Sequence, residues 1–158
     1  MKATIFSLLI SYLFLMPIAS SGADSVPLDF NNCALHGTYA YKNVAQDVAS
    51  FGVIRFDGKG NASLDIRING RDPEQKTTRR TLTATGKGTY EVGPSGIGHV
   101  NISFSGIAIK QGTYDFVLID QSEGVASTVF AVLRDGGVNG QLVDPTWTLL
   151  QSPDHSDC

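Results

Sequence analysis

The residues of this chain that are capable of chemistry do not form a catalytic motif. Its three histidines, His36, His99 and His155, are far apart in the sequence, and no Gly-x-Ser-x-Gly elbow for a nucleophilic serine occurs. Asp115 and Asp120 have opposite parity on one expected strand, so they cannot face one cleft as a glycosidase pair would. Motif-based hydrolysis is therefore not supported.

Metal and phosphate sites are not indicated either. The segment 154–157, Asp-His-Ser-Asp, is the only cluster of acidic and imidazole side chains, and it reads as a polar tail. The glycine-rich segments 57–61 and 93–96 are typical of hairpin turns, because a phosphate-binding loop would lead into a helix. We expect no metal and no cofactor.

The two cysteines, Cys33 and Cys158, lie near the two ends of the expected mature chain. In an oxidising compartment a disulfide between them is the economical interpretation. It would close a loop of roughly 125 residues and contribute about 4 to 5 kcal/mol to stability. Unpaired or intermolecular thiols are the alternative.

The first 23 residues have the features of a secretory signal peptide. Lys2 is followed by an apolar run over 5–15, then by Pro17 and small residues over 19–23. That run is shorter than the roughly 20 residues that a membrane-spanning helix needs. The sequence thus predicts a leader over 1–23, one domain over 24–158, a secreted or periplasmic location and no membrane anchor.

The charge balance argues against nucleic acid as a partner. Lys and Arg number 12 against 15 Asp and Glu, for a net charge of -3. This leaves no excess of basic residues to neutralise a phosphate backbone. The oligomeric state is left open, because an unpaired edge strand would also permit a dimer.

The sequence pattern predicts strands along the whole mature chain, because no segment shows apolar residues at helical spacing. Short strand-like stretches alternate with Gly, Asn and Asp turns, which is typical of a sandwich or barrel. The stretches are 37–43, 50–56, 62–69, 81–92, 98–104, 114–120, 127–134 and 140–149. We expect an all-β fold, a single antiparallel up-and-down barrel of about eight strands.

Two hairpins define the faces of their strands. Centring the first turn on Lys59 places Ile54 opposite Leu64, and centring the second near Ser95 places Tyr90 opposite Val100. One face of each hairpin is then apolar and the other polar. Several glycines fall on the apolar face, as strands that bend into a small barrel require. An interior filled by side chains and one with a ligand cavity are both compatible with this pattern.

Three motifs resemble a group of small exported bacterial proteins of unknown function. They are Cys-Ala-Leu-His-Gly-Thr-Tyr over 33–39, Phe-Gly-Val-Ile-Arg-Phe-Asp-Gly-Lys-Gly-Asn over 51–61 and Gly-Lys-Gly-Thr-Tyr-Glu-Val over 86–92. The resemblance covers roughly 33–134 and implies a lipocalin-like or allene-oxide-cyclase-like barrel, which does not carry function. Proteins of that group often have their second cysteine in the turn that here spans 93–98, where this chain has none.

The barrel interior is the remaining place for function. Aromatic residues would line a pocket there, with tyrosine hydroxyls as orienting polar groups. The candidates are Tyr39, Tyr41, Tyr90, Tyr114, Phe116 and Phe130. We expect a secreted barrel that binds a small apolar or amphipathic molecule or acts as a surface interaction module. The alternative is a cyclase or isomerase that folds a reactive substrate inside the barrel.

Overall fold

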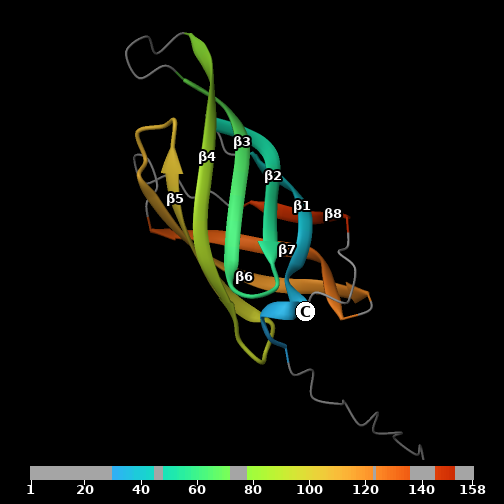
Figure 1. The fold of residues 1–158 in the computed structure, drawn as a ribbon. Coiled ribbons are helices and arrows are strands. Elements are labelled where there is room, and N and C mark those ends of the chain that lie inside the picture. Colours follow the sequence, from blue (N-terminus) through green and yellow to red (C-terminus); the bar gives the residue numbers. More distant parts are fainter. Residues whose placement is uncertain (1–29, 45–47, 72–77, 123, 136–144, 152–158) are drawn as a thin grey trace, which may run out of the picture.

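Eight antiparallel strands follow one another around a closed barrel in which β1 pairs with β8 (Figure 1). The computed structural model describes residues 30–44, 48–71, 78–122, 124–135 and 145–151. A short 3-10 helix, η1 (Asn32–Ala34), precedes the strands. The strands are β1 (His36–Val44), β2 (Val48–Asp57), β3 (Asn61–Arg71), β4 (Arg79–Val92), β5 (Ile97–Ser105), β6 (Gln111–Ser122), β7 (Val125–Asp135) and β8 (Thr146–Gln151).

This architecture confirms the predicted all-β, up-and-down barrel of eight strands. The expected leader over 1–23 lies outside the described residues, and so do His155 and Cys158. Within the described part of the chain, no helix is long and apolar enough to span a membrane.

Both predicted hairpin registers are confirmed. Ile54 pairs with Leu64 across β2 and β3, and Tyr90 pairs with Val100 across β4 and β5. The first turn is held by Asp57, whose Oδ1 accepts hydrogen bonds of 2.8 Å from the backbone N–H groups of Lys59 and Asn61. A tight turn fixes which residues face each other, and with them the faces of both strands.

The inward faces of all eight strands form one apolar core. Its largest fully buried side chains include Trp147, Tyr39, Leu35, Ile54 and Leu64. Glycines on the inward face let neighbouring strands approach closely: a Cβ at Gly52 would lie 2.0 Å from the Asp65 carbonyl oxygen, and one at Gly88 would lie 1.8 Å from that of Asn101. These positions are the bends that a small barrel requires.

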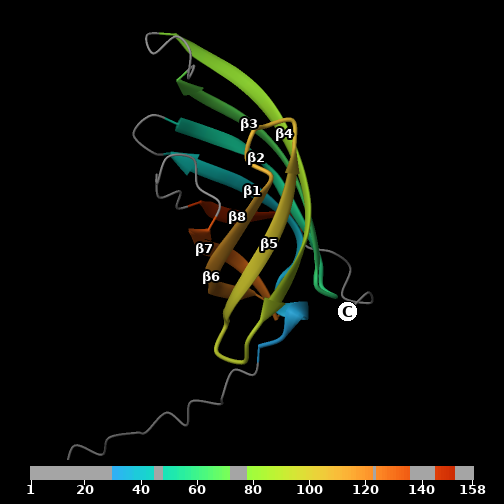
Figure 2. The ribbon, with the colours of Figure 1, turned by 90° about the vertical axis from the view of Figure 1, so that its left-hand side faces the viewer.

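The N-terminal turn plugs one end of the barrel, beside the β4–β5 turn (Figure 2). Leu35 is completely buried there, and its backbone carbonyl accepts a hydrogen bond of 2.7 Å from the Tyr90 hydroxyl. The side-chain oxygen of Asn32 accepts a further bond from the Val92 N–H, at 2.8 Å. We call the end of the barrel that holds this N-terminal turn the plugged end. The opposite end, where β1 ends and β2 begins, is called the far end.

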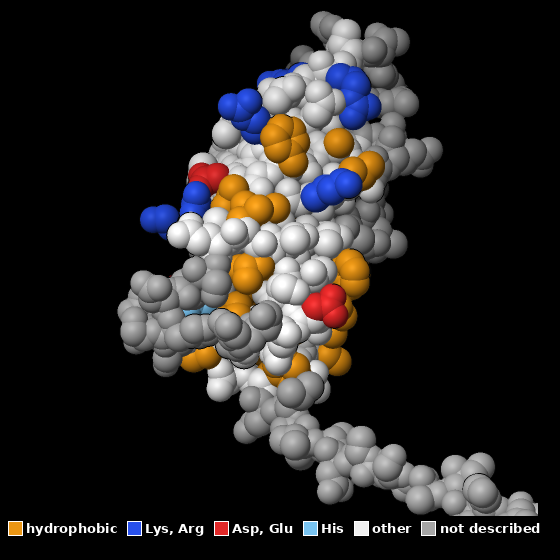
Figure 3. All heavy atoms as spheres, turned by 90° about the vertical axis from the view of Figure 1, so that its right-hand side faces the viewer, with side chains coloured by type: hydrophobic (Ala, Val, Ile, Leu, Met, Phe, Trp, Pro, Cys, Tyr) orange, Lys and Arg blue, Asp and Glu red, His pale blue; other side chains and the backbone are white. Residues whose placement is uncertain are grey.

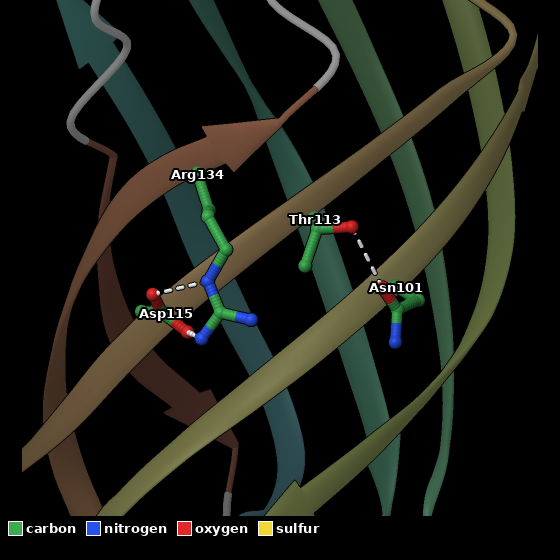
Figure 4. Close-up of polar contacts among 4 residues, drawn as sticks. All are labelled: Asn101, Thr113, Asp115 and Arg134. Atoms are coloured by element: carbon green, nitrogen blue, oxygen red, sulfur yellow. Dashed lines mark hydrogen bonds and ion pairs between the residues drawn. The ribbon is translucent and has the colours of Figure 1, made fainter.

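Figure 3 shows the face that lies at the right of Figure 1, where apolar side chains are scattered among basic, acidic and neutral ones. The exposed large apolar residues are Val44, Phe51, Ile97, Phe130, Val132 and Leu150. Polar contacts link neighbouring strands across the outside of β5, β6 and β7 (Figure 4). There Arg134 pairs with Asp115, and the Thr113 hydroxyl donates to Asn101 Oδ1 at 2.7 Å.

Candidate functional site

Five of the six aromatic residues proposed as pocket lining lie in the interior. Tyr39, Tyr41, Tyr90, Tyr114 and Phe116 are all buried. Phe130 is 51% exposed, because the inward positions of β7 at this level are Val129, Ala131 and Leu133. Phe130 therefore lies on the outer face of the barrel and does not line its interior.

Two of the interior tyrosines, Tyr39 and Tyr90, donate hydrogen bonds to backbone carbonyls. The Tyr39 hydroxyl donates to the Ala126 carbonyl at 2.8 Å, and the Tyr90 hydroxyl donates to the Leu35 carbonyl at 2.7 Å. Their rings pack edge-on against Phe56, at centroid distances of 5.6 and 4.9 Å. Both hydroxyl protons are donated to backbone carbonyls at the plugged end, so neither hydroxyl has a proton left to donate to a ligand.

Trp147 continues the aromatic core on the other side of Phe56. Its ring centroid lies 5.5 Å from that of Phe56 and 5.8 Å from that of Phe116. These tilted contacts fix the indole inside the barrel. Phe116 thus belongs to an aromatic stack that includes the only tryptophan of the chain.

A second group of polar side chains lies inside the barrel, toward the far end. Tyr41 comes from β1, Ser50 from β2 and Tyr114 from β6, and the Tyr41 hydroxyl is hydrogen-bonded with the side chains of Ser50 and Tyr114. Asn43 follows Tyr41 on the same face of β1 and is the register partner of Ser50. We call Tyr41, Asn43, Ser50 and Tyr114 the interior polar cluster.

Two buried polar atoms in the interior have no hydrogen-bond partner. One is Oδ1 of Asn43, a residue only 2% exposed, and the other is Nε1 of Trp147, which is 1% exposed. Buried polar groups are hydrogen-bonded in the great majority of cases, and an unmet one costs about 1 to 3 kcal/mol. The barrel thus holds one unmet acceptor and one unmet donor among its described residues.

The ionisation of the cluster suits binding better than proton transfer. Burial raises the pKa of Tyr41, although its hydrogen bonds with Ser50 and Tyr114 oppose the shift. Burial also raises the pKa of Tyr114, and the neighbouring Tyr41 raises it further. Both tyrosines therefore remain protonated at neutral pH, where they can donate hydrogen bonds but cannot act as bases.

Charged chemistry is sparse in the described interior. The buried polar or ionisable residues, apart from tyrosine and tryptophan, are His36, Asn43 and Ser50, and His36 begins β1 at the plugged end. Among the described residues, no three His, Cys, Asp or Glu side chains come together as metal ligands would. Toward the far end, the described interior therefore offers hydroxyl and amide groups as its polar groups.

The sequence analysis did not predict Asn43 and Ser50 as interior residues, because they flank an expected loop, where polar residues are common. A usable signal was present in the alternation of β1: Tyr39, Tyr41 and Asn43 share one parity, while Lys42 and Val44 point outward and are exposed. Extending that parity to the end of the strand places an amide in the core.

Comparison with known proteins gives no family for this chain: no family model matches it, and no curated protein or solved structure shows significant similarity.

Proposed function

We propose that this protein is an exported barrel that binds a small apolar or amphipathic molecule in its interior, toward the far end. The observation that carries the proposal is Asn43 Oδ1, a buried acceptor with no partner, next to hydroxyl groups that can orient a ligand. A fully buried amide that serves only the fold would be expected to have its oxygen satisfied within the chain.

The surroundings of the cluster supply the apolar contacts of such a site. Tyr41 and Tyr114 contribute aromatic rings, and buried aliphatic side chains occupy neighbouring inward positions on β3, β5 and β7. Small-molecule sites have this composition, largely apolar with a few well-placed polar groups. Because the buried Leu35 fills the plugged end, we propose that a ligand enters from the far end.

Export is the second part of the proposal and rests on the leader-like segment 1–23 and on the resemblance to small exported bacterial barrels. In an oxidising compartment Cys33 would pair with Cys158. Cys33 belongs to η1, so this bond would fasten the plug. The intact mass of the unreduced protein, lower by two hydrogen atoms than that of the reduced protein, would support the pairing.

Native mass spectrometry of the protein purified from an exporting host tests the binding. We expect a mass above that of the polypeptide, and the excess should disappear on denaturation without reductant. An Asn43→Val variant should carry less of the same molecule, while an outer-face variant, Thr113→Val, should carry as much as the wild type. A bare polypeptide mass for the wild type, with no uptake of added small apolar compounds, would exclude ligand binding.

A further inference from the structure

The unmet atom of Asn43 restricts the chemistry of the ligand, provided that the proposed function is correct. An amide oxygen accepts hydrogen bonds and cannot donate them. A ligand that satisfies Asn43 Oδ1 must therefore present a donor, such as a hydroxyl or an N–H group.

The remaining members of the interior polar cluster favour a hydroxyl. Ser50, Tyr41 and Tyr114 all carry hydroxyl groups, which both donate and accept. Because Ser50 is the register partner of Asn43, an accepting and a donating group stand on adjacent strands. A ligand hydroxyl could donate to Asn43 and accept from the hydroxyl cluster at the same time.

The charge of the interior restricts the ligand further. Among the described residues no Asp, Glu, Lys or Arg is buried, so the interior polar cluster contains no counter-charge for a carboxylate or an ammonium group. Transfer of such an ion from water into an apolar interior without a partner is strongly unfavourable. The headgroup that enters should be neutral.

We infer that the barrel selects neutral molecules with an apolar body and a hydroxyl group, and that Asn43 Oδ1 accepts the hydrogen bond from that hydroxyl.

Four probes with the same chain length test this selection: 1-octanol, octyl methyl ether, octylamine and octanoate, each titrated calorimetrically into the protein. The alcohol and the ether differ chiefly in the donor. We expect the alcohol to bind about 5- to 30-fold more tightly than the ether, as one buried hydrogen bond allows. The amine and the carboxylate should bind more weakly than the alcohol at neutral pH.

The variant Asn43→Val should bring the alcohol-to-ether ratio close to one, and Asn43→Ala serves as a second variant that introduces no additional bulk. Thr113→Val, on the outer face, should keep the wild-type ratio. Equal affinities for alcohol and ether, or tightest binding of the carboxylate or the amine, would overturn the inference while leaving the binding function intact. Absence of binding by all four probes would count against the function itself.

Discussion

Replacing Asn43 by valine is expected to make the unliganded protein more stable. The wild-type residue holds an acceptor that is buried without a partner, at a cost of about 1 to 3 kcal/mol. Valine removes that acceptor and suits a β-strand better than asparagine does. Rearrangement of the side chains packed around residue 43 offsets part of the gain, so we expect a net stabilisation of about 1 to 2 kcal/mol.

Urea denaturation measures this change. For a domain of this size, with an m value of about 2 kcal/mol/M, the unfolding midpoint should rise by about 0.5 to 1 M. Because added bulk could obscure the effect, Asn43→Ala is measured beside it and should cost little or nothing, unlike an ordinary truncation in a core.

Thr113→Val is the matched control because it also replaces a polar strand residue by valine. The Thr113 hydroxyl is satisfied by Asn101 Oδ1 at 2.7 Å, so its loss should destabilise the barrel slightly, by about 0.5 to 1 kcal/mol. The two valine substitutions thus have opposite expected signs. Destabilisation by more than about 1 kcal/mol in both Asn43 variants would refute the claim that Asn43 Oδ1 is buried without a hydrogen-bond partner.

Three further predictions concern the rest of the fold. Tyr90→Phe leaves the buried Leu35 carbonyl without its donor, so it should lower the free energy of unfolding by about 1 to 3 kcal/mol and increase hydrogen exchange in residues 32–35. Unchanged exchange there would contradict the role of Tyr90 in holding the N-terminal turn in place. Gly88→Ala forces a Cβ to within 1.8 Å of the Asn101 carbonyl oxygen, so the midpoint of thermal unfolding should fall sharply. Gly124 is exposed and has open space around it, but its φ of 81° suits glycine and strains alanine, so Gly124→Ala should cost only about 1 kcal/mol. All four tyrosines in residues 30–151 have a raised pKa, chiefly through burial, above the ordinary value of 10.0. The unfolded chain therefore loses these protons first, stability falls as the pH rises above 10.0, and tyrosinate absorbance should appear together with unfolding; ionisation of these tyrosines near pH 10 in the folded protein would contradict their burial.

The hairpins were the most predictable part of the fold. In β2–β3 and β4–β5, a short glycine-rich turn separates two stretches of alternating apolar and polar residues, so one turn position determines every pair. The observed pairs Ile54–Leu64 and Tyr90–Val100 are those that the turns predict. Local chemistry sufficed because these contacts are local in sequence.

The outward orientation of Phe130 could not be predicted from turns and alternation alone. On β7 the inward Val129, Ala131 and Leu133 alternate with the outward Phe130 and Val132, so both faces are apolar and the pattern does not distinguish them. Only the closing of the barrel decides which face is inside, and that depends on pairing with β6 and β8.

The site was only partly predictable for a related reason. Tyr41 and Tyr114 were identifiable as inward aromatic residues, but their grouping with Ser50 joins strands β1, β2 and β6, and contact between β1 and β6 arises only when the barrel closes. The plug was missed because the buried Leu35 precedes the first strand, where a single apolar residue gives no periodic signal.

The most direct test of ligand binding in the interior uses the single indole of the chain. Trp147 Nε1 is buried without a partner, and residues 1–158 contain no other tryptophan, so one side-chain N–H resonance in a ¹H–¹⁵N NMR spectrum reports on the core. Titration with 1-octanol should shift this resonance in a saturable manner, and the shift should weaken in Asn43→Val. An indole resonance that stays in place at saturating alcohol, while only outer-face amides move, would contradict a binding site inside the barrel.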